Sequence, residues 1–191
     1  MTAETRQRLV DAAVALTRRQ GIAGTTVADL LHASGVARRT LYLHFVGGRD
    51  ELLVEGIRSI GQSMTENLTA VLGTRSASES IDTFVGSMRA GLTAGQFRSG
   101  CPILQAALGG ADIPQASKDA GLTMTRWSES IARRLEADGV AEDRARSLAH
   151  LVVAGIEGAV AMGVATGSAG PLDDVGRLLL ELIGSEDSVT A

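Results

Sequence analysis

Proline is scarce and glycine is frequent in this chain, and that combination constrains the fold more than any other feature. The 191 residues contain 23 glycines and three prolines, which are Pro102, Pro114 and Pro171. Because proline disrupts helix interiors, the long segments without it can form long helices. Apolar residues make up 45% of the chain but aromatic residues only 3%, a balance that favours helices packed through small residues over a β-sandwich. We therefore predict an all-α protein.

Apolar residues recur at helical spacing between the glycines. Leu9, Ala13 and Leu16 share one face of a helix that we expect over residues 4–20, and Gly21 is suited to end it. Further helices are predicted over residues 50–71, 80–94, 102–109, 112–138, 142–166 and 171–184.

Two short helices joined by a glycine turn are predicted after the first helix. Thr26 is placed to cap one of them, with Asp29 in its first turn. Gly35 supplies the positive φ that a tight turn requires. The next helix, over about 37–44, would bury Leu41. This is the pattern of a DNA-binding helix-turn-helix, and the alternative is a structural helical hairpin with solvated arginines.

Positive charge is concentrated at the N-terminal end. Residues 1–49 contain seven arginines and three acidic residues, a net charge of +4, whereas the whole chain carries −4. This asymmetry favours a nucleic-acid-facing module on an acidic body, although ordinary surface scatter could also produce it. The candidate DNA contacts are Thr25, Thr26, Arg38, Arg39, Thr40, Tyr42, His44 and Arg49. We expect Arg38, Arg39 and Thr40 to reach base edges and the others to contact phosphates.

The same region resembles a known signature. The chain reads GIAGTTVADL over 21–30, ASGV over 33–36 and TLYLHF over 40–45, which is similar to the DNA-binding signature of the TetR family. The resemblance implies a three-helix head over 1–49 and a ligand-binding and dimerisation body over 50–191. It also implies a homodimer on a palindromic operator and a small-molecule effector.

Weaker motifs resemble the LmrA/YxaF-like branch of that family. They are the loop FVGGRDEL over 45–52, the triplet Gly100-Cys101-Pro102, Trp127, the run IEGA over 156–159, and Pro171-Leu172. Arg49 stands where the family usually has lysine. It keeps the positive charge that a phosphate contact needs, but with a different geometry.

The body contains residues suited to an effector pocket. The candidates are Phe84, Met88, Phe97, Cys101, Leu104, Met124, Trp127 and Met162. Each alone could belong to the core, and the family resemblance favours a pocket for the set. Met and aromatic walls suit flat apolar ligands. Because few charged groups fall among these residues, we expect a neutral or weakly polar effector.

Small residues in the predicted 142–166 helix and leucines in the last helix predict a dimer seam. Its candidates are Gly155, Glu157, Gly158, Leu178 and Leu182. Two helices from each subunit would form a four-helix bundle. The alternative is that these residues pack inside one subunit.

No pattern of catalytic, cofactor-binding or metal-binding residues is found. The three histidines lack a metal-ligand spacing, and no nucleophile elbow or phosphate loop occurs. The single cysteine, Cys101, cannot form an internal disulfide, which favours a cytoplasmic protein; it could sense oxidants or be inert packing. The apolar stretch 148–164 contains His150 and Glu157, which favours a buried helix over a membrane span.

These observations predict a DNA-binding transcriptional regulator with no enzymatic activity. We expect a repressor that a small, mostly apolar effector releases from its operator. An activator or dual regulator of the same fold is the first alternative. A small-molecule-binding helical protein or an enzyme, without DNA binding, is the second.

Overall fold

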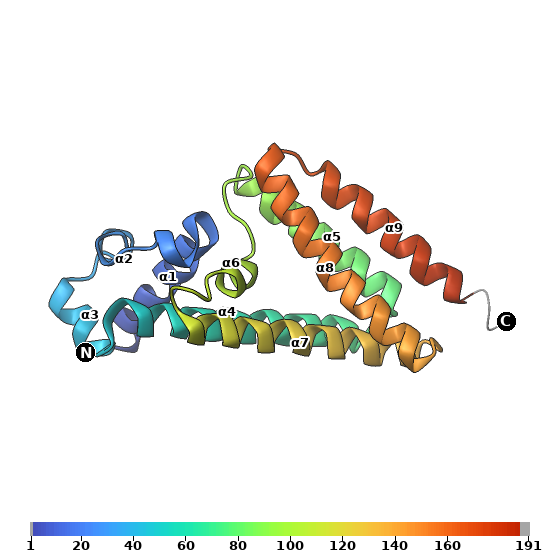
Figure 1. Ribbon diagram of the computed structural model, residues 1–191, viewed down its shortest axis with the longest axis horizontal. Helices are drawn as coiled ribbons and strands as arrows, with labels where there is room; N and C mark the ends of the chain where they lie inside the picture. The colour runs from blue at the N-terminus through green and yellow to red at the C-terminus, as the bar shows by residue number, and fades with distance from the viewer. Residues whose placement is uncertain (1, 188–191) are drawn as a thin grey trace. The chain divides into compact units, whose positions relative to one another are not determined.

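The chain is described by a computed structural model over residues 2–187, with side chains to residue 184. Within that range the protein consists of helices and connecting loops, without strands, and the all-α prediction is confirmed. The helices are α1 (Ala3–Gly24), α2 (Val27–Ser34), α3 (Arg38–His44), α4 (Gly48–Leu72), α5 (Ala77–Ala94), α6 (Pro102–Leu108), α7 (Pro114–Ala137), α8 (Glu142–Thr166) and α9 (Gly170–Asp187), as Figure 1 labels them.

The described residues form two compact units. Unit 1 comprises those of Met1–Ser63 and Cys101–Thr123, and unit 2 those of Met64–Gly100 and Met124–Ala191. Helices α4 and α7 each contribute to both units. The predicted functional division, with a DNA-binding head over residues 1–49 and a ligand-binding and dimerisation body over 50–191, stays a prediction.

In unit 1, helix α1 packs against α2 and α6. Gly21 interrupts α1 with φ of +71°, where the sequence predicted the helix to end, and a short final turn continues to Gly24. The core of this unit includes Leu9, Leu41 and Phe45, each at most 1% exposed. These side chains hold the three N-terminal helices together and fix the position of α3.

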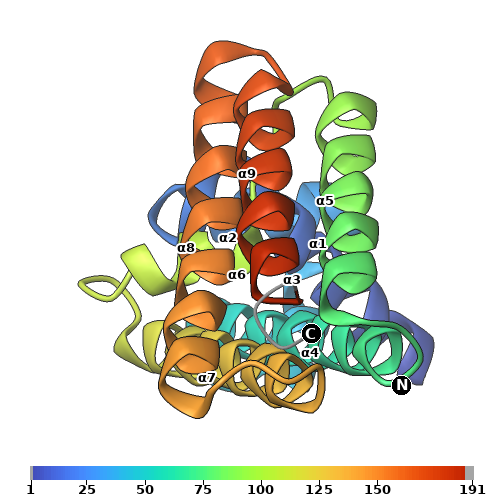
Figure 2. The ribbon, with the colours of Figure 1, turned by 90° about the vertical axis from the view of Figure 1, so that its right-hand side faces the viewer.

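In unit 2, helix α9 packs against both α5 and α8, as Figures 1 and 2 show from two sides. Small residues allow these helices to approach closely. A Cβ atom added at Gly176 would lie 2.8 Å from Cγ1 of Val85, and one added at Gly163 would lie 3.2 Å from Cδ1 of Leu92. Replacing either glycine would therefore push α5 away from its neighbours.

Helix α8 is long and apolar enough to cross a membrane by composition alone. Its Leu148, Val152, Ile156 and Val160 side chains are nevertheless buried inside unit 2. Their spacing of four residues places them on one helix face. This face of the helix is therefore packed in the core, in agreement with the buried helix that the sequence predicted for residues 148–164.

Candidate DNA-binding surface and ligand cavity

The start of α2 is fixed by a reciprocal pair of hydrogen bonds. The backbone N–H of Asp29 donates to Oγ1 of Thr26 over 3.2 Å, and the backbone N–H of Thr26 donates to Oδ2 of Asp29 over 3.1 Å. Hydrogen bonds from the side chain and then the backbone of Thr26 lower the pKa of Asp29. Gly35 ends the helix with φ of +64°. The cap and the turn are both as the sequence predicted.

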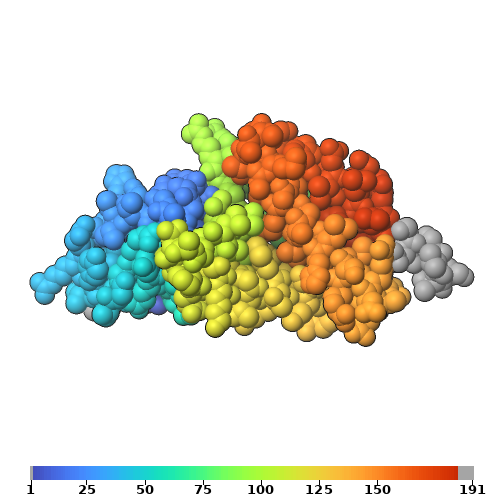
Figure 3. Space-filling view, in the orientation of Figure 1, coloured from blue at the N-terminus to red at the C-terminus, as the bar shows by residue number. Residues whose placement is uncertain are grey.

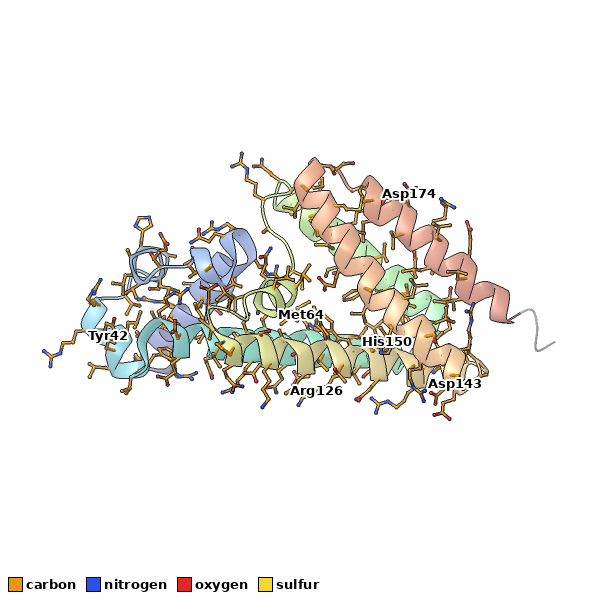
Figure 4. The ribbon with its side chains drawn as sticks, viewed as in Figure 1. Tyr42, Met64, Arg126, Asp143, His150 and Asp174 are labelled. Atoms are coloured by element: carbon orange, nitrogen blue, oxygen red, sulfur yellow. The ribbon has the colours of Figure 1, made fainter. Side chains whose placement is uncertain are left out.

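Helix α3 buries one side and exposes the other. Leu41 is fully buried, whereas Arg38, Arg39 and Tyr42 are exposed. Figure 4 labels Tyr42 on α3 within the three-helix head. Neither arginine forms an ion pair with another described residue. Thr40 is half-buried beside them. The exposed face therefore carries two cations that are free to meet an anionic partner.

Leu43 also belongs to this exposed face, and the sequence reasoning missed it. Its side chain is 52% exposed, and it lies one helical turn after Arg39. The spacing of four residues was the available signal, because it places two residues on the same helix face. An exposed leucine on a helix that reads DNA can contact the methyl group of thymine.

Three of the predicted DNA contacts have internal partners or buried atoms. Thr25 is fully buried, and its Oγ1 donates to the carbonyl oxygen of Gly21 over 2.7 Å. Arg49 donates to the carbonyl oxygens of Thr25 and Ile22. His44 has its Nε2 atom buried. Phosphate contacts by these three residues remain predictions that the geometry does not favour.

A small cavity lies inside unit 2, between α4, α5, α7 and α8. Its volume is about 20 Å³, which is room for one water molecule. Trp127 contributes to its wall and is 3% exposed, and the indole Nε1–H donates to Oγ1 of Thr65 over 2.9 Å. The other lining residues are Leu68, Leu72, Ser80, Ile81, Phe84, Ile131, Val152, Val153, Ile156 and Glu157.

A larger groove of about 190 Å³ lies beside this cavity, between α4 and α5. Met64, Val71 and Met88 are among its apolar residues, and Figure 4 shows Met64 on α4. Leu68, Ser80 and Phe84 line both spaces. These three shared residues are therefore the wall that separates the groove from the internal cavity.

The predicted pocket residues divide between these spaces and other places. Phe84 and Trp127 line the cavity, and Phe84 and Met88 line the groove. The other five line neither. Cys101 and Leu104 belong to unit 1, because the short helix α6 packs against α1. Phe97 lies in the loop after α5, Met124 lies on α7, and the side chain of Met162 is 57% exposed on α8.

The predicted dimer residues also divide, because some are buried and others are exposed. Glu157 is only 8% exposed and lines the internal cavity, which gives it a different position from the predicted seam. Gly158 is exposed, as are Leu178 and Leu182 of α9. Leu151 and Met162 extend the exposed apolar face of α8. Surfaces of α8 and α9 adjoin in the space-filling view of Figure 3. We call these five exposed residues the α8–α9 face.

The fold and the exposed α3 face define a helix-turn-helix protein whose second unit contains a cavity. Residues 9–55 match the family described as bacterial regulatory proteins, tetR family. Residues 77–178 match the C-terminal domain of LmrA/YxaF-like transcriptional regulators. The chain belongs to the TetR family of transcriptional regulators. It is accordingly a DNA-binding regulator and not an enzyme.

Individual relatives agree with that family. An HTH-type transcriptional regulator of Mycobacterium tuberculosis is 32% identical over 187 residues, covering 95% of each chain. The HTH-type transcriptional regulator LmrA of Bacillus subtilis is 22% identical, covering 94% of this chain and 97% of LmrA. The structure of regulatory protein TetR from Rhodobacter sphaeroides superposes with a TM-score of 0.84 at 19% identity. That match covers 94% of this chain and 98% of the other.

Proposed function

We propose that this protein is a cytoplasmic repressor that binds a palindromic operator as a homodimer and leaves it when a small molecule enters unit 2. The observation that carries the proposal is the exposed face of α3, where Arg38 and Arg39 have no ion-pair partner among the described residues. Solvated arginines on a helix of this kind reach guanine edges and phosphates in a major groove.

The α8–α9 face supports the homodimer. Leu178 and Leu182 of α9 and Met162 and Leu151 of α8 expose apolar side chains, and the two helices pack against each other. Gly158 lies on the same face without a side chain, and a Cβ atom added there would meet nothing within 4 Å in the protomer. A second copy could therefore approach the backbone of α8 closely, and two helices from each subunit would form a four-helix bundle.

Helix α4 supports the coupling between ligand and DNA. It is one continuous helix from Gly48 to Leu72, and it contains both Arg49 and the cavity residue Leu68. A ligand that displaces Leu68 acts directly on the helix that begins after α3. It shifts the operator equilibrium only by its difference in affinity between the bound and released conformations.

The test begins with selection of a palindromic duplex from a randomised library, using the full-length protein. The expected product has half-sites about 34–36 Å apart, which corresponds to successive major grooves. Failure to enrich any sequence over non-specific DNA would contradict the proposal. A reporter gene placed behind the selected operator then distinguishes repression from activation. Repression supports the proposal, whereas activation would establish the alternative of an activator or dual regulator.

A further inference from the structure

We propose that Leu43 is a specificity-determining residue, which recognises the 5-methyl group of a thymine in the operator. The inference rests on the proposed function, because it takes α3 as the helix that reads the operator. It adds an apolar base contact to the hydrogen bonds expected of the arginines on the same helix. It also fixes where the thymine lies in each half-site, relative to the base that Arg39 reads.

Leu43 lies on the side of α3 that faces away from the core. Its side chain is 52% exposed, whereas those of Leu41 and Phe45 are at most 1% exposed. Leu41 and Leu43 are two residues apart, or about 200° around the helix, so their side chains point in nearly opposite directions. Packing within the protomer is therefore provided by the other side of α3 and does not explain a leucine at position 43.

The neighbour of Leu43 on this face indicates what kind of partner covers it. Arg39 precedes Leu43 by one helical turn, is exposed, and forms no ion pair with another described residue. An apolar protein surface that covered Leu43 would also bury the charge of Arg39, which is costly. The major groove of DNA suits both side chains, because it presents acceptors for an arginine and methyl groups for a leucine.

The base edges offer a leucine one kind of partner. They present nitrogen and oxygen acceptors, amino donors and the 5-methyl group of thymine, which is the one apolar group among them. The leucine side chain has no hydrogen-bonding atom, so its contact with a donor or an acceptor would remove water from that group without replacing the hydrogen bond. Contact with the methyl group instead removes apolar surface from water. Leu43 therefore favours thymine over the other bases at its position.

The spacing between Arg39 and Leu43 limits where the thymine lies. Four residues of an α-helix rise by about 6 Å, and successive base pairs of DNA are about 3.4 Å apart. The two residues are thus separated along the groove by no more than about two base-pair steps. We expect each half-site to contain the thymine within about two base pairs of the guanine that Arg39 reads.

The test removes the methyl group and nothing else. Each thymine of the selected operator is replaced in turn, in one half-site at a time, by deoxyuridine, which pairs as thymine does but lacks the 5-methyl group. At one thymine, within about two base pairs of the position that Arg39→Ala relaxes, the wild-type protein is expected to lose about fourfold in affinity. Anisotropy of the labelled duplex measures the loss. Unchanged affinity at every thymine in that range would overturn the proposal.

Leu43→Ala assigns the loss to one side chain. We expect this variant to bind the thymine and deoxyuridine operators equally, because alanine does not reach the methyl group. Val46→Ala is the matched control, since Val46 is 87% exposed but lies beyond the end of α3, and it should keep the fourfold preference. Circular dichroism shows whether both variants keep their helices. A preference for thymine that survives in Leu43→Ala, or that is lost in Val46→Ala instead, would overturn the assignment of Leu43.

A second measurement restores the methyl group on another base and needs no variant. The identified T·A pair is replaced by C·G, with either cytosine or 5-methylcytosine. The wild-type protein is expected to bind the methylated duplex about fourfold more tightly, and equal binding would overturn the proposal. Failure to select any operator would mean that the proposed function itself has failed. A selected operator whose affinity ignores these methyl groups would leave that function intact and overturn only the role of Leu43.

Discussion

The guanidinium of Arg49 donates to the carbonyl oxygen of Thr25 from Nε over 2.5 Å and to that of Ile22 from a terminal nitrogen over 2.6 Å. These two bonds connect the first turn of α4 to the last turn of α1 and to Thr25, the residue that follows it. The planar guanidinium can reach both oxygens at once, and a lysine ammonium is a point charge without that fork. Arg49 therefore holds the start of α4 at the end of α1.

Arg49→Lys is expected to lower the free energy of unfolding by about 1–2 kcal/mol, because two charge-assisted hydrogen bonds lose their geometry. The salt dependence of operator binding should stay the same. Denaturant unfolding and binding titrations at several salt concentrations measure the two effects. A salt slope reduced by about one, with unchanged stability, would show that Arg49 contacts a phosphate after all.

Arg39→Ala is expected to weaken binding to the selected operator by about 1–3 kcal/mol and to relax the base preference at one position. The reason is that Arg39 is exposed on α3 without an ion-pair partner among the described residues. Binding to a panel of operator variants measures the change. Arg126→Ala removes another exposed arginine, from α7, and serves as the control. Equal losses on every operator variant would mean that Arg39 reads no base.

Gly158→Arg is expected to convert the dimer to monomers without unfolding the protomer. An added Cβ atom at Gly158 meets nothing within 4 Å inside the protomer, but an arginine would place an unpaired charge in an apolar seam. Light scattering measures the mass, and circular dichroism reports on the fold. Gly86→Arg is the control, since Gly86 of α5 is equally unobstructed. A dimer that persists in Gly158→Arg would place the interface elsewhere.

Thr26→Ala is expected to destabilise the protein by about 1 kcal/mol at neutral pH, because it removes the cap of α2. Hydrogen bonds from Thr26 hold the pKa of Asp29 below its ordinary value in the folded state. The stabilisation from that carboxylate is therefore complete above the unfolded pKa and is lost as pH falls through the lower folded pKa. Unfolding at neutral and acidic pH tests this prediction. The difference between the wild type and Thr26→Ala should shrink on the acidic side, and a constant difference would contradict the contribution of Asp29.

A small molecule that binds unit 2 is expected to weaken operator binding, and the operator is expected to weaken the binding of that molecule by the same factor. A tenfold effect corresponds to about 1.4 kcal/mol of coupling. Titrating the molecule with and without the selected operator measures the second effect, and anisotropy of labelled operator measures the first. Identical affinity for the molecule in both titrations would exclude allosteric release by it, however tightly it binds.

Much of the head could be predicted from the sequence because its determinants are local. The capping pair of Thr26 and Asp29 spans one helical turn, and the positive φ of Gly35 depends on its missing side chain. The alternation of buried Leu41 and exposed Arg39 follows from the period of the helix. Interactions of this range are set by neighbouring residues, so no knowledge of the tertiary fold was needed.

The cavity and the α8–α9 face were decided by packing between distant segments. Glu157 and Gly158 are adjacent in the sequence, but successive residues of an α-helix point about 100° apart. Glu157 is therefore buried, because the cavity-lining residues of α4, α5 and α7 cover its side of α8, whereas Gly158 is exposed. Periodicity identified an apolar helix, but it could not say which side would be buried within the protein and which would stay exposed.

Arg49 shows the same limit within the head. Its charge and its place after α3 made a phosphate contact the natural sequence prediction, but two carbonyl oxygens more than twenty residues earlier accept its hydrogen bonds. The sequence determined the helices, their caps and the family to which the chain belongs, because these follow from local geometry and a contiguous signature. The tertiary structure alone decided which charged side chains face outward and which are satisfied within the protein, because a hydrogen bond depends on distance in space rather than separation along the chain.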